Sequence, residues 1–138
     1  MIDITIDRSD IQLSARNWKK TTKELFLLGA RYWKEKILPR HFQHGAAAKY
    51  KYDKRNENYE IRKRKRKGHT TPLVYSGNMR DMLLSSDNIK TVGAETAVVI
   101  LAGPRYLPLH RRKLNEPDKA AEILAITKDE EKEIANVM

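Results

Sequence analysis

The segment Lys49–Lys67 constrains the fold most, because its nineteen residues cannot contribute to a hydrophobic core. It contains ten lysines and arginines against three acidic residues, and so carries +7 of the chain's formal net charge of +10. Blocks of like charge this dense usually remain solvated and mobile until a partner neutralises them. We therefore expect a single domain over residues 1–138, with a protruding basic segment at about residues 44–72. Its cationic side chains are Lys49, Lys51, Lys54, Arg55, Arg62, Lys63, Arg64, Lys65, Arg66 and Lys67.

The composition of the rest of the chain indicates one core and a polyanionic partner. Hydrophobic residues make up 40% of the 138 residues, which is enough for one compact domain, and the pI near 9.8 favours an anionic partner. The chain has no cysteine, so disulfides, thiol catalysis and thiolate metal sites are excluded. The longest apolar run, Ala97–Ala102, is far shorter than the roughly 20 residues that a membrane helix needs. We expect no membrane partner.

The N-terminal third predicts a strand followed by a long helix. Ile2, Ile4 and Ile6 alternate with polar residues, as in a strand with one buried face. From Trp18 to Phe42 the apolar residues recur three to four apart, which predicts an amphipathic helix with Trp33 in the core. Pro39 should end or kink this helix. Between strand and helix we expect turn and cap residues, namely Ser9, Asp10, Ser14 and Asn17.

The central part of the chain predicts short elements. Asn56 can cap a helix that fades after Ile61 as like charges accumulate, and Gly68 marks its end. Ser76 should cap the next helix, which carries Met79, Met82, Leu83 and Leu84.

A hairpin and two C-terminal helices should follow. The hairpin strands are Asn88–Thr91 and Thr96–Ala102, with Val98, Ile100 and Ala102 on one face. A helical turn is expected over Lys119–Leu124. Thr127 and Glu130 form a capping box for a last helix over Lys128–Val137. The predicted fold class is α+β: a small, mainly antiparallel β-sheet packed by one long helix and shorter helices, with a long basic loop.

Catalytic and metal-binding patterns find no support in the sequence. His41 and His44 are three residues apart, but no carboxylate or third histidine nearby completes a metal site. The serine in Tyr75–Gly77 lacks the first glycine of a nucleophile elbow, and no glycine-rich phosphate loop is present. We therefore expect no enzyme activity, no cofactor and no metal.

The run Arg62–Lys67 admits more than one interpretation. Its composition fits a nuclear address. It also fits a nucleic-acid grip, in which Tyr50, Tyr52 and Tyr59 would stack on exposed bases. No helix-turn-helix, RNA-recognition or KH pattern accompanies it, so any contact would be with phosphates rather than with sequence.

A third interpretation comes from the order of features in "ILPRHFQHGAAAKYKYDKRNENYEIRKRKRKGHTTPLVYSGNMRDMLL". A long amphipathic helix precedes an aromatic and basic segment, which ends in a lysine–arginine run. A proline–leucine step, a serine, a glycine and a short helix with a basic residue follow, and then a hairpin. This order resembles the virion morphogenesis and tail-completion proteins of tailed bacteriophages over about residues 18–107. The positions that match the family are Pro72, Leu73, Ser76, Gly77 and Arg80.

The resemblance implies a structural subunit of the head–tail junction, or neck, of a virion. Such a subunit would form a ring with copies of itself around the DNA channel, and would contact other neck, connector or tail proteins. It would be found in the virion, and in the host cytoplasm during assembly. The basic segment would meet either DNA in the channel or an acidic protein surface, for which the helix at Asp129–Glu133 is one complement. The alternative is a non-specific nucleic-acid-binding protein that uses residues 49–67.

Overall fold

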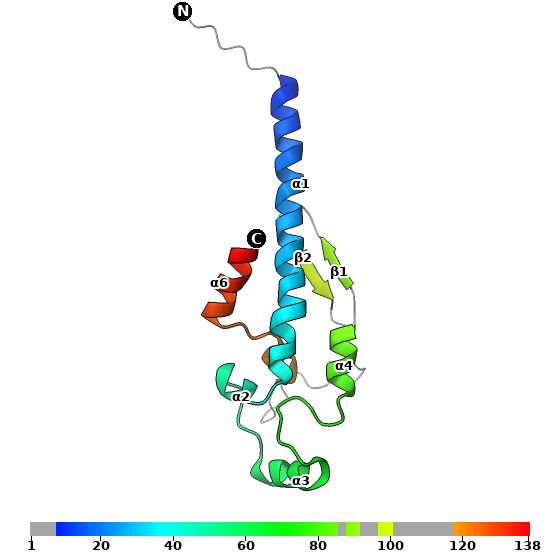
Figure 1. The fold of residues 1–138 in the computed structure, drawn as a ribbon, viewed down its shortest axis with the longest axis vertical. Helices are drawn as coiled ribbons and strands as arrows, with labels where there is room; N and C mark the ends of the chain where they lie inside the picture. The colour runs from blue at the N-terminus through cyan, green and yellow to red at the C-terminus, as the bar shows by residue number, and fades with distance from the viewer. Residues whose placement is uncertain (1–7, 86–87, 92–96, 101–117) are drawn as a thin grey trace, which may run out of the picture.

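The computed structural model describes residues 8–85, 88–91, 97–100 and 118–138 of the chain. Its long axis is the helix α1 (Arg8–Tyr32), which continues through a π-helical turn, η1 (Trp33–Ile37), and a 3-10 turn, η2 (Leu38–Phe42). Figure 1 shows that the first half of α1 projects beyond the other elements, which gather around its second half. The change of helix type coincides with Pro39, which stands in the first turn of η2 and has no N–H for an α-helical hydrogen bond.

The predicted long helix is confirmed, but its predicted start at about Trp18 is wrong. The helix begins at Arg8, so Ser9, Asp10, Ser14 and Asn17 lie within it rather than in a preceding turn. These residue types are weak evidence for a helix end, because each costs at most about 0.7 kcal/mol relative to alanine inside a helix. The predicted strand at Ile2–Ile6 lies outside the described residues.

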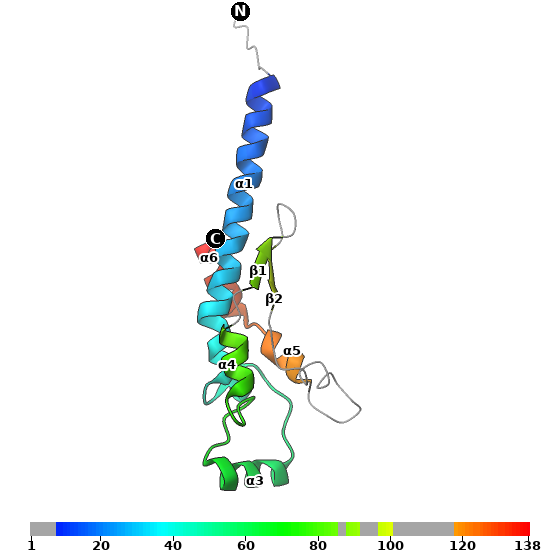
Figure 2. The ribbon, with the colours of Figure 1, turned by 90° about the vertical axis from the view of Figure 1, so that its right-hand side faces the viewer.

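The basic segment contains two helices, α2 (Ala46–Lys49) and α3 (Glu57–Lys67). Asn56 caps α3 through its side chain, which accepts a hydrogen bond from the Asn58 N–H at 2.9 Å, and Gly68 ends it in a left-handed conformation. Both termini are as predicted, but the helix does not fade after Ile61. Figure 2 shows α3 lying across the end of the molecule opposite the free end of α1, away from the other helices.

The chain then returns to the body. The helix α4 (Asn78–Ser85) packs against η2, and the strands β1 (Asn88–Thr91) and β2 (Ala97–Ile100) pair with each other in antiparallel register and contact α1. The register pairs Lys90 with Val98 and Asn88 with Ile100, and Val99 packs against the core. The predicted antiparallel pairing is therefore confirmed, whereas Thr96, Ala102 and the turn between the strands lie outside the described residues.

Two C-terminal helices complete the described residues. The helix α5 (Lys119–Leu124) contacts η2, and α6 (Lys128–Val137) lies along α1. Both have the predicted bounds, and the capping box of Thr127 and Glu130 is present. Gly29 of α1 permits the approach of α6, because a Cβ there would lie 2.9 Å from Met138 Sδ and 3.3 Å from Ile134 Cγ2.

The predicted fold class is wrong. The core is made by helices packing on helices, and it includes Trp33, as expected, at 8% exposure. Within the described ranges, the only β-structure is one pair of four-residue strands, so no sheet forms a layer for the helices to cover. The turns η1 and η2 supply half of the core residues, and α4 and α5 pack against them. The core residues are Trp33, Ile37, Leu38, Phe42, Val74, Met79, Leu83 and Ile123.

Candidate functional site

Residues 46–55, which we call the base of the basic segment, are held in place by a buried carboxylate. The capping box fixes Glu130 in the first turn of α6: its N–H donates to Thr127 Oγ1 at 3.3 Å, and its Oε2 accepts the Thr127 N–H at 3.2 Å. The other oxygen, Oε1, accepts hydrogen bonds from Lys49 Nζ at 2.5 Å and from the Tyr50 hydroxyl at 2.6 Å. Glu130 is 1% exposed, so this carboxylate joins α2 to α6 in the interior.

Arg40 of η2 extends this network. Its guanidinium donates to Glu130 Oε1 at 3.3 Å and to Glu133 Oε2 at 2.9 Å, and the Tyr32 hydroxyl donates to the same Glu133 oxygen at 3.0 Å. Burial alone would raise the pKa of Glu130. The hydrogen bonds from Lys49, Tyr50 and the Thr127 N–H outweigh it and lower the pKa to about 2.

A second buried carboxylate binds the C-terminal end of the base, at Asp53 and Arg55. Glu122 of α5 is 7% exposed and accepts two hydrogen bonds from the Arg55 guanidinium, one of them at 3.0 Å. It also accepts the backbone N–H of Asp53 at 3.2 Å. The chain that leads into α3 is therefore attached to both C-terminal helices.

Tyr50 and Tyr52, which were predicted to stack on nucleic-acid bases, lie instead at the base of the basic segment. The Tyr50 ring stacks on His41, with centroids 3.9 Å apart and planes 15° apart, and the Tyr52 hydroxyl lies 2.5 Å from His41 Nδ1. Burial lowers the pKa of His41 to about 4, so the imidazole is neutral near pH 7. The stacking prediction is wrong for Tyr50, which is buried; Tyr52 is half-buried, with its hydroxyl against His41.

The cations of α3 divide into two groups. Lys63 is 4% exposed, and its Nζ donates to the carbonyl of Thr71 at 2.5 Å; burial lowers its pKa. The Lys67 ammonium lies over the Tyr75 ring, 5.1 Å from its centroid. Four cations are exposed and form no ion pair with any described residue: Arg62, Arg64, Lys65 and Arg66.

The remaining predicted cations lie within the base. Lys51 and Lys54 are exposed in the loop that joins α2 to α3, and Lys51 adopts a left-handed conformation with φ of 52°. The ten predicted cations therefore include Lys49, Arg55, Lys63 and Lys67, each of which has a partner within the chain, and six that are exposed and form no ion pair with a described residue.

The positions on which the predicted resemblance to the phage family depends form the return path from α3 to α4. Pro72 is half-buried, and Leu73 packs against the core with φ of 58°. Gly77 has φ of 88°, and its carbonyl accepts the N–H of Asp81, so α4 begins after Gly77 and not after Ser76, which is exposed. Arg80 Nε donates to its neighbour Asp81 at 2.8 Å. This motif builds a turn, and it brings no cluster of functional side chains together.

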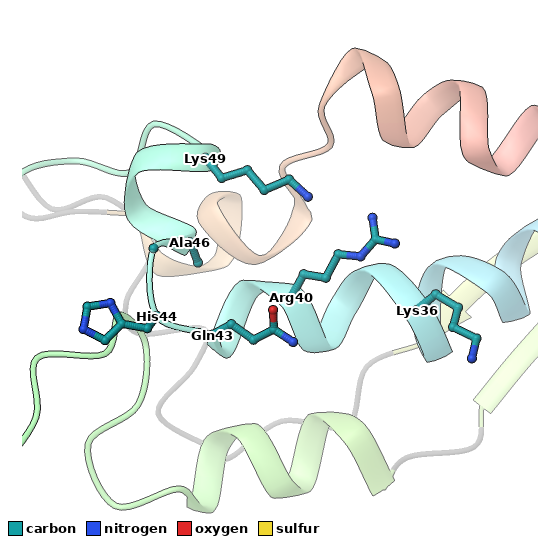
Figure 3. A pocket seen from close by; sticks show the side chains of 7 residues that line it. Lys36, Arg40, Gln43, His44, Ala46 and Lys49 are labelled. Carbon is teal, nitrogen blue, oxygen red and sulfur yellow. The ribbon is translucent and has the colours of Figure 1, made fainter.

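A cavity of about 340 Å³ lies between η2 and α2, lined by Lys36, Arg40, Gln43, His44, Gly45, Ala46 and Lys49. Figure 3 shows Arg40 and Lys49 pointing to the side of α6, whereas Lys36 and His44 point elsewhere. Because Glu130 already binds both Arg40 and Lys49, the cavity offers no convergent set of free cations to a small anion. The described residues also contain no cluster of histidines and carboxylates that could hold a metal ion.

None of the described helices is both long enough and apolar enough to cross a membrane. Comparison with protein-family models, with curated proteins and with solved structures found no match to this chain.

The sequence did not reveal the buried carboxylates. The capping box identified the backbone role of Glu130 but not its partners, which lie eighty or more positions earlier in the chain. The one available signal was the acidic stretch Asp129–Glu133, expected as a complement of the basic segment, and Glu130 of this stretch binds Lys49 within the same chain.

Proposed function

We propose that the protein is a structural subunit of the head–tail junction of a tailed bacteriophage, and that it acts without catalysis as part of a ring around the DNA channel. The observation that carries the proposal is the order of features along the chain. A long helix, a basic excursion, the turn at Pro72–Gly77, a short helix, a hairpin and a capped terminal helix follow one another in the order typical of tail-completion proteins.

Two features of the molecule support an assembly role. The first half of α1 projects beyond the other described elements (Figure 1). Trp18, which lies in this half, is 71% exposed. Large exposed aromatic residues are common at protein interfaces. At the opposite end, α3 is held out by two chain segments, which suits an arm that reaches a neighbour.

The alternative is a nucleic-acid-binding protein that acts outside a particle, and the four free cations of α3 favour it. One experiment separates the two functions. Purified particles from the lysate that produces the protein are analysed by quantitative mass spectrometry and by immunogold labelling. The neck proposal expects label at the junction of capsid and tail, at low copy number per particle. Absence from finished particles would reject it and leave the alternative.

A further inference from the structure

The cations of α3 differ from Lys49 and Arg55 at the base in having no carboxylate partner among the described residues. We propose that α3 binds the phosphate backbone of double-stranded DNA through Arg62, Arg64, Lys65 and Arg66. Lys63 and Lys67 do not bind DNA in this proposal but position the helix on the protein. That this DNA lies in a neck channel rests on the proposed function; the contact itself rests on the geometry of α3.

The caps of α3 and its contact with the protein hold the helix in place before a ligand binds. The helix is capped at both ends, by Asn56 and Gly68, and the Lys63 ammonium ties its inner face to the Thr71 carbonyl. Successive helical residues are 100° apart, so the four free cations spread around the faces that Lys63 does not occupy. A cation cluster on a preformed helix avoids the entropy cost of ordering a flexible arm at the moment of binding.

The composition of α3 favours DNA over an acidic protein. A helix that docks in a protein groove presents apolar anchors at i, i+3 or i+4, and i+7. The only aliphatic side chain in Glu57–Lys67 is Ile61, which is 58% exposed. Phosphate contacts need only positive charge and hydrogen-bond donors, which Arg62, Arg64, Lys65 and Arg66 supply.

A duplex is favoured over a single strand. Base stacking needs free aromatic faces. The exposed tyrosines are Tyr59, within α3, and Tyr75, which follows it, and an ammonium lies over one face of each ring. Lys63 Nζ is 6.0 Å from the Tyr59 centroid and Lys67 Nζ is 5.1 Å from the Tyr75 centroid. The groups of α3 that remain available to a ligand are therefore exposed guanidinium and ammonium groups, which bind phosphates.

The test compares two variants that lose the same charge. In the first, Arg62, Arg64, Lys65 and Arg66 are replaced by glutamine, which retains helix propensity. In the second, the exposed α1 residues Arg16, Lys19, Lys20 and Lys23 are replaced in the same way. The affinity of the full chain for a labelled 30-base-pair duplex is measured by fluorescence anisotropy over a range of salt concentrations, with a single strand of the same length in parallel. Circular dichroism confirms that each variant is folded.

We expect the α3 variant to lose about tenfold or more in affinity, and its plot of log affinity against log salt to become shallower by about 3 to 4, since each phosphate contact contributes about 0.9 to this slope. The α1 variant should keep most of the slope. A double variant, Arg64→Gln with Lys65→Gln, should reduce the slope by about half as much. This variant replaces the fourfold variant in the test if the fourfold variant does not fold. Equal losses in the α3 and α1 variants would overturn the proposal, because binding would then follow net charge and not a site.

Other outcomes also decide the matter. No binding of duplex by the wild type at low salt, or tighter binding of the single strand, would overturn the proposal. Loss of assembly in the α3 variant with unchanged DNA affinity would assign α3 to a protein partner, so the proposal would fail while the neck function stood. Duplex binding that is lost in the α3 variant but kept in the α1 variant, by a protein that is absent from particles, would uphold the proposal and reject the neck function.

Discussion

The base of the basic segment and the helix α3 have similar compositions but different surroundings. At the base, Lys49 and Arg55 are bound by Glu130 and Glu122, which are nearly fully buried. On α3, four neighbouring cations face solvent without a carboxylate among the described residues. Similar side chains therefore hold the fold together in one region and remain available for a partner in the other.

The difference shows that a run of like charge is not one functional unit. A cation paired with a buried carboxylate cannot be removed without leaving that carboxylate uncompensated, which is strongly destabilising. A solvated cation on a helix contributes little to stability, and its removal is felt in binding. The two groups should therefore respond to substitution in opposite ways.

The largest expected effect is at Glu130. Glu130→Ala removes the acceptor for Lys49, Tyr50 and Arg40 and breaks the capping box, so we expect a loss of about 3 to 5 kcal/mol in the free energy of unfolding. Urea denaturation measures it. The control is Glu131→Ala, the exposed neighbour on the same helix, which should change stability by no more than about 0.5 kcal/mol. Equal effects of the two substitutions would contradict the role of Glu130 as the link between α2 and α6.

The same base should make stability depend on pH in two steps. His41 has its pKa lowered to about 4 from 6.5, so the unfolded state takes up a proton that the folded state does not as the pH falls from 6.5 to 4. Glu130 has its pKa lowered to about 2 from 4.5, so its stabilising charge is complete above pH 4.5 and lost as the pH falls to 2. Each step corresponds to about 3 kcal/mol. Urea denaturation at pH 7, 4 and 2.5 should resolve both, and Glu130→Ala should remove the lower one. A lower step that persists in this variant would assign it to another group.

A smaller effect is expected where α6 meets α1. Gly29→Leu places a side chain against Ile134 and Met138, and overpacking of this kind costs about 1 to 3 kcal/mol. Because α6 carries Glu130, its displacement should also weaken the bonds to Lys49 and Tyr50, and the pKa of Glu130 should rise toward its ordinary value. Carboxylate titration by NMR measures this. Lys20→Leu, at an exposed position on the same helix, should leave the pKa unchanged.

The smallest effect is expected on α3. Replacing Arg62, Arg64, Lys65 and Arg66 by glutamine should change the free energy of unfolding by about 0.5 kcal/mol or less. All four side chains are exposed and form no ion pair with a described residue, and the one hydrogen bond among them, from Arg62 Nε to the Asn58 carbonyl, is at the surface. Adding Lys63→Gln to this variant should cost more, since Lys63 is buried and bound to Thr71. If the fourfold variant unfolds, α3 is part of the structural framework and the contrast with the base is lost.

Local signals in the sequence predicted local structure well. The caps at Asn56, Gly68 and Thr127 defined helix ends that the structure confirms, because a cap depends on residues within one turn of the chain. The hairpin was predicted for the same reason. The start of α1 was not, since the polar residues from Ser9 to Asn17 read equally well as a turn.

Long-range pairing could not be predicted in the same way. Nothing near Lys49 or Arg55 shows that a carboxylate from α5 or α6 binds it, and nothing near Lys63 distinguishes it from the five cations around it in the run Arg62–Lys67. The fold class failed for the same reason: it assumed that the hairpin joins a larger sheet, whereas the core is closed by contacts between helices.

The most direct test of the account compares Arg55→Gln with Arg64→Gln, the same chemical change at the base and on α3. Both the free energy of unfolding and the affinity for duplex DNA are measured for each variant. The account predicts that Arg55→Gln costs about 3 kcal/mol, because Glu122 is left buried without its partner, and leaves the DNA affinity of the folded protein nearly unchanged. Arg64→Gln should keep the stability within about 0.5 kcal/mol and weaken DNA binding. If both substitutions changed stability and affinity to the same extent, the division between anchoring and binding cations would be wrong.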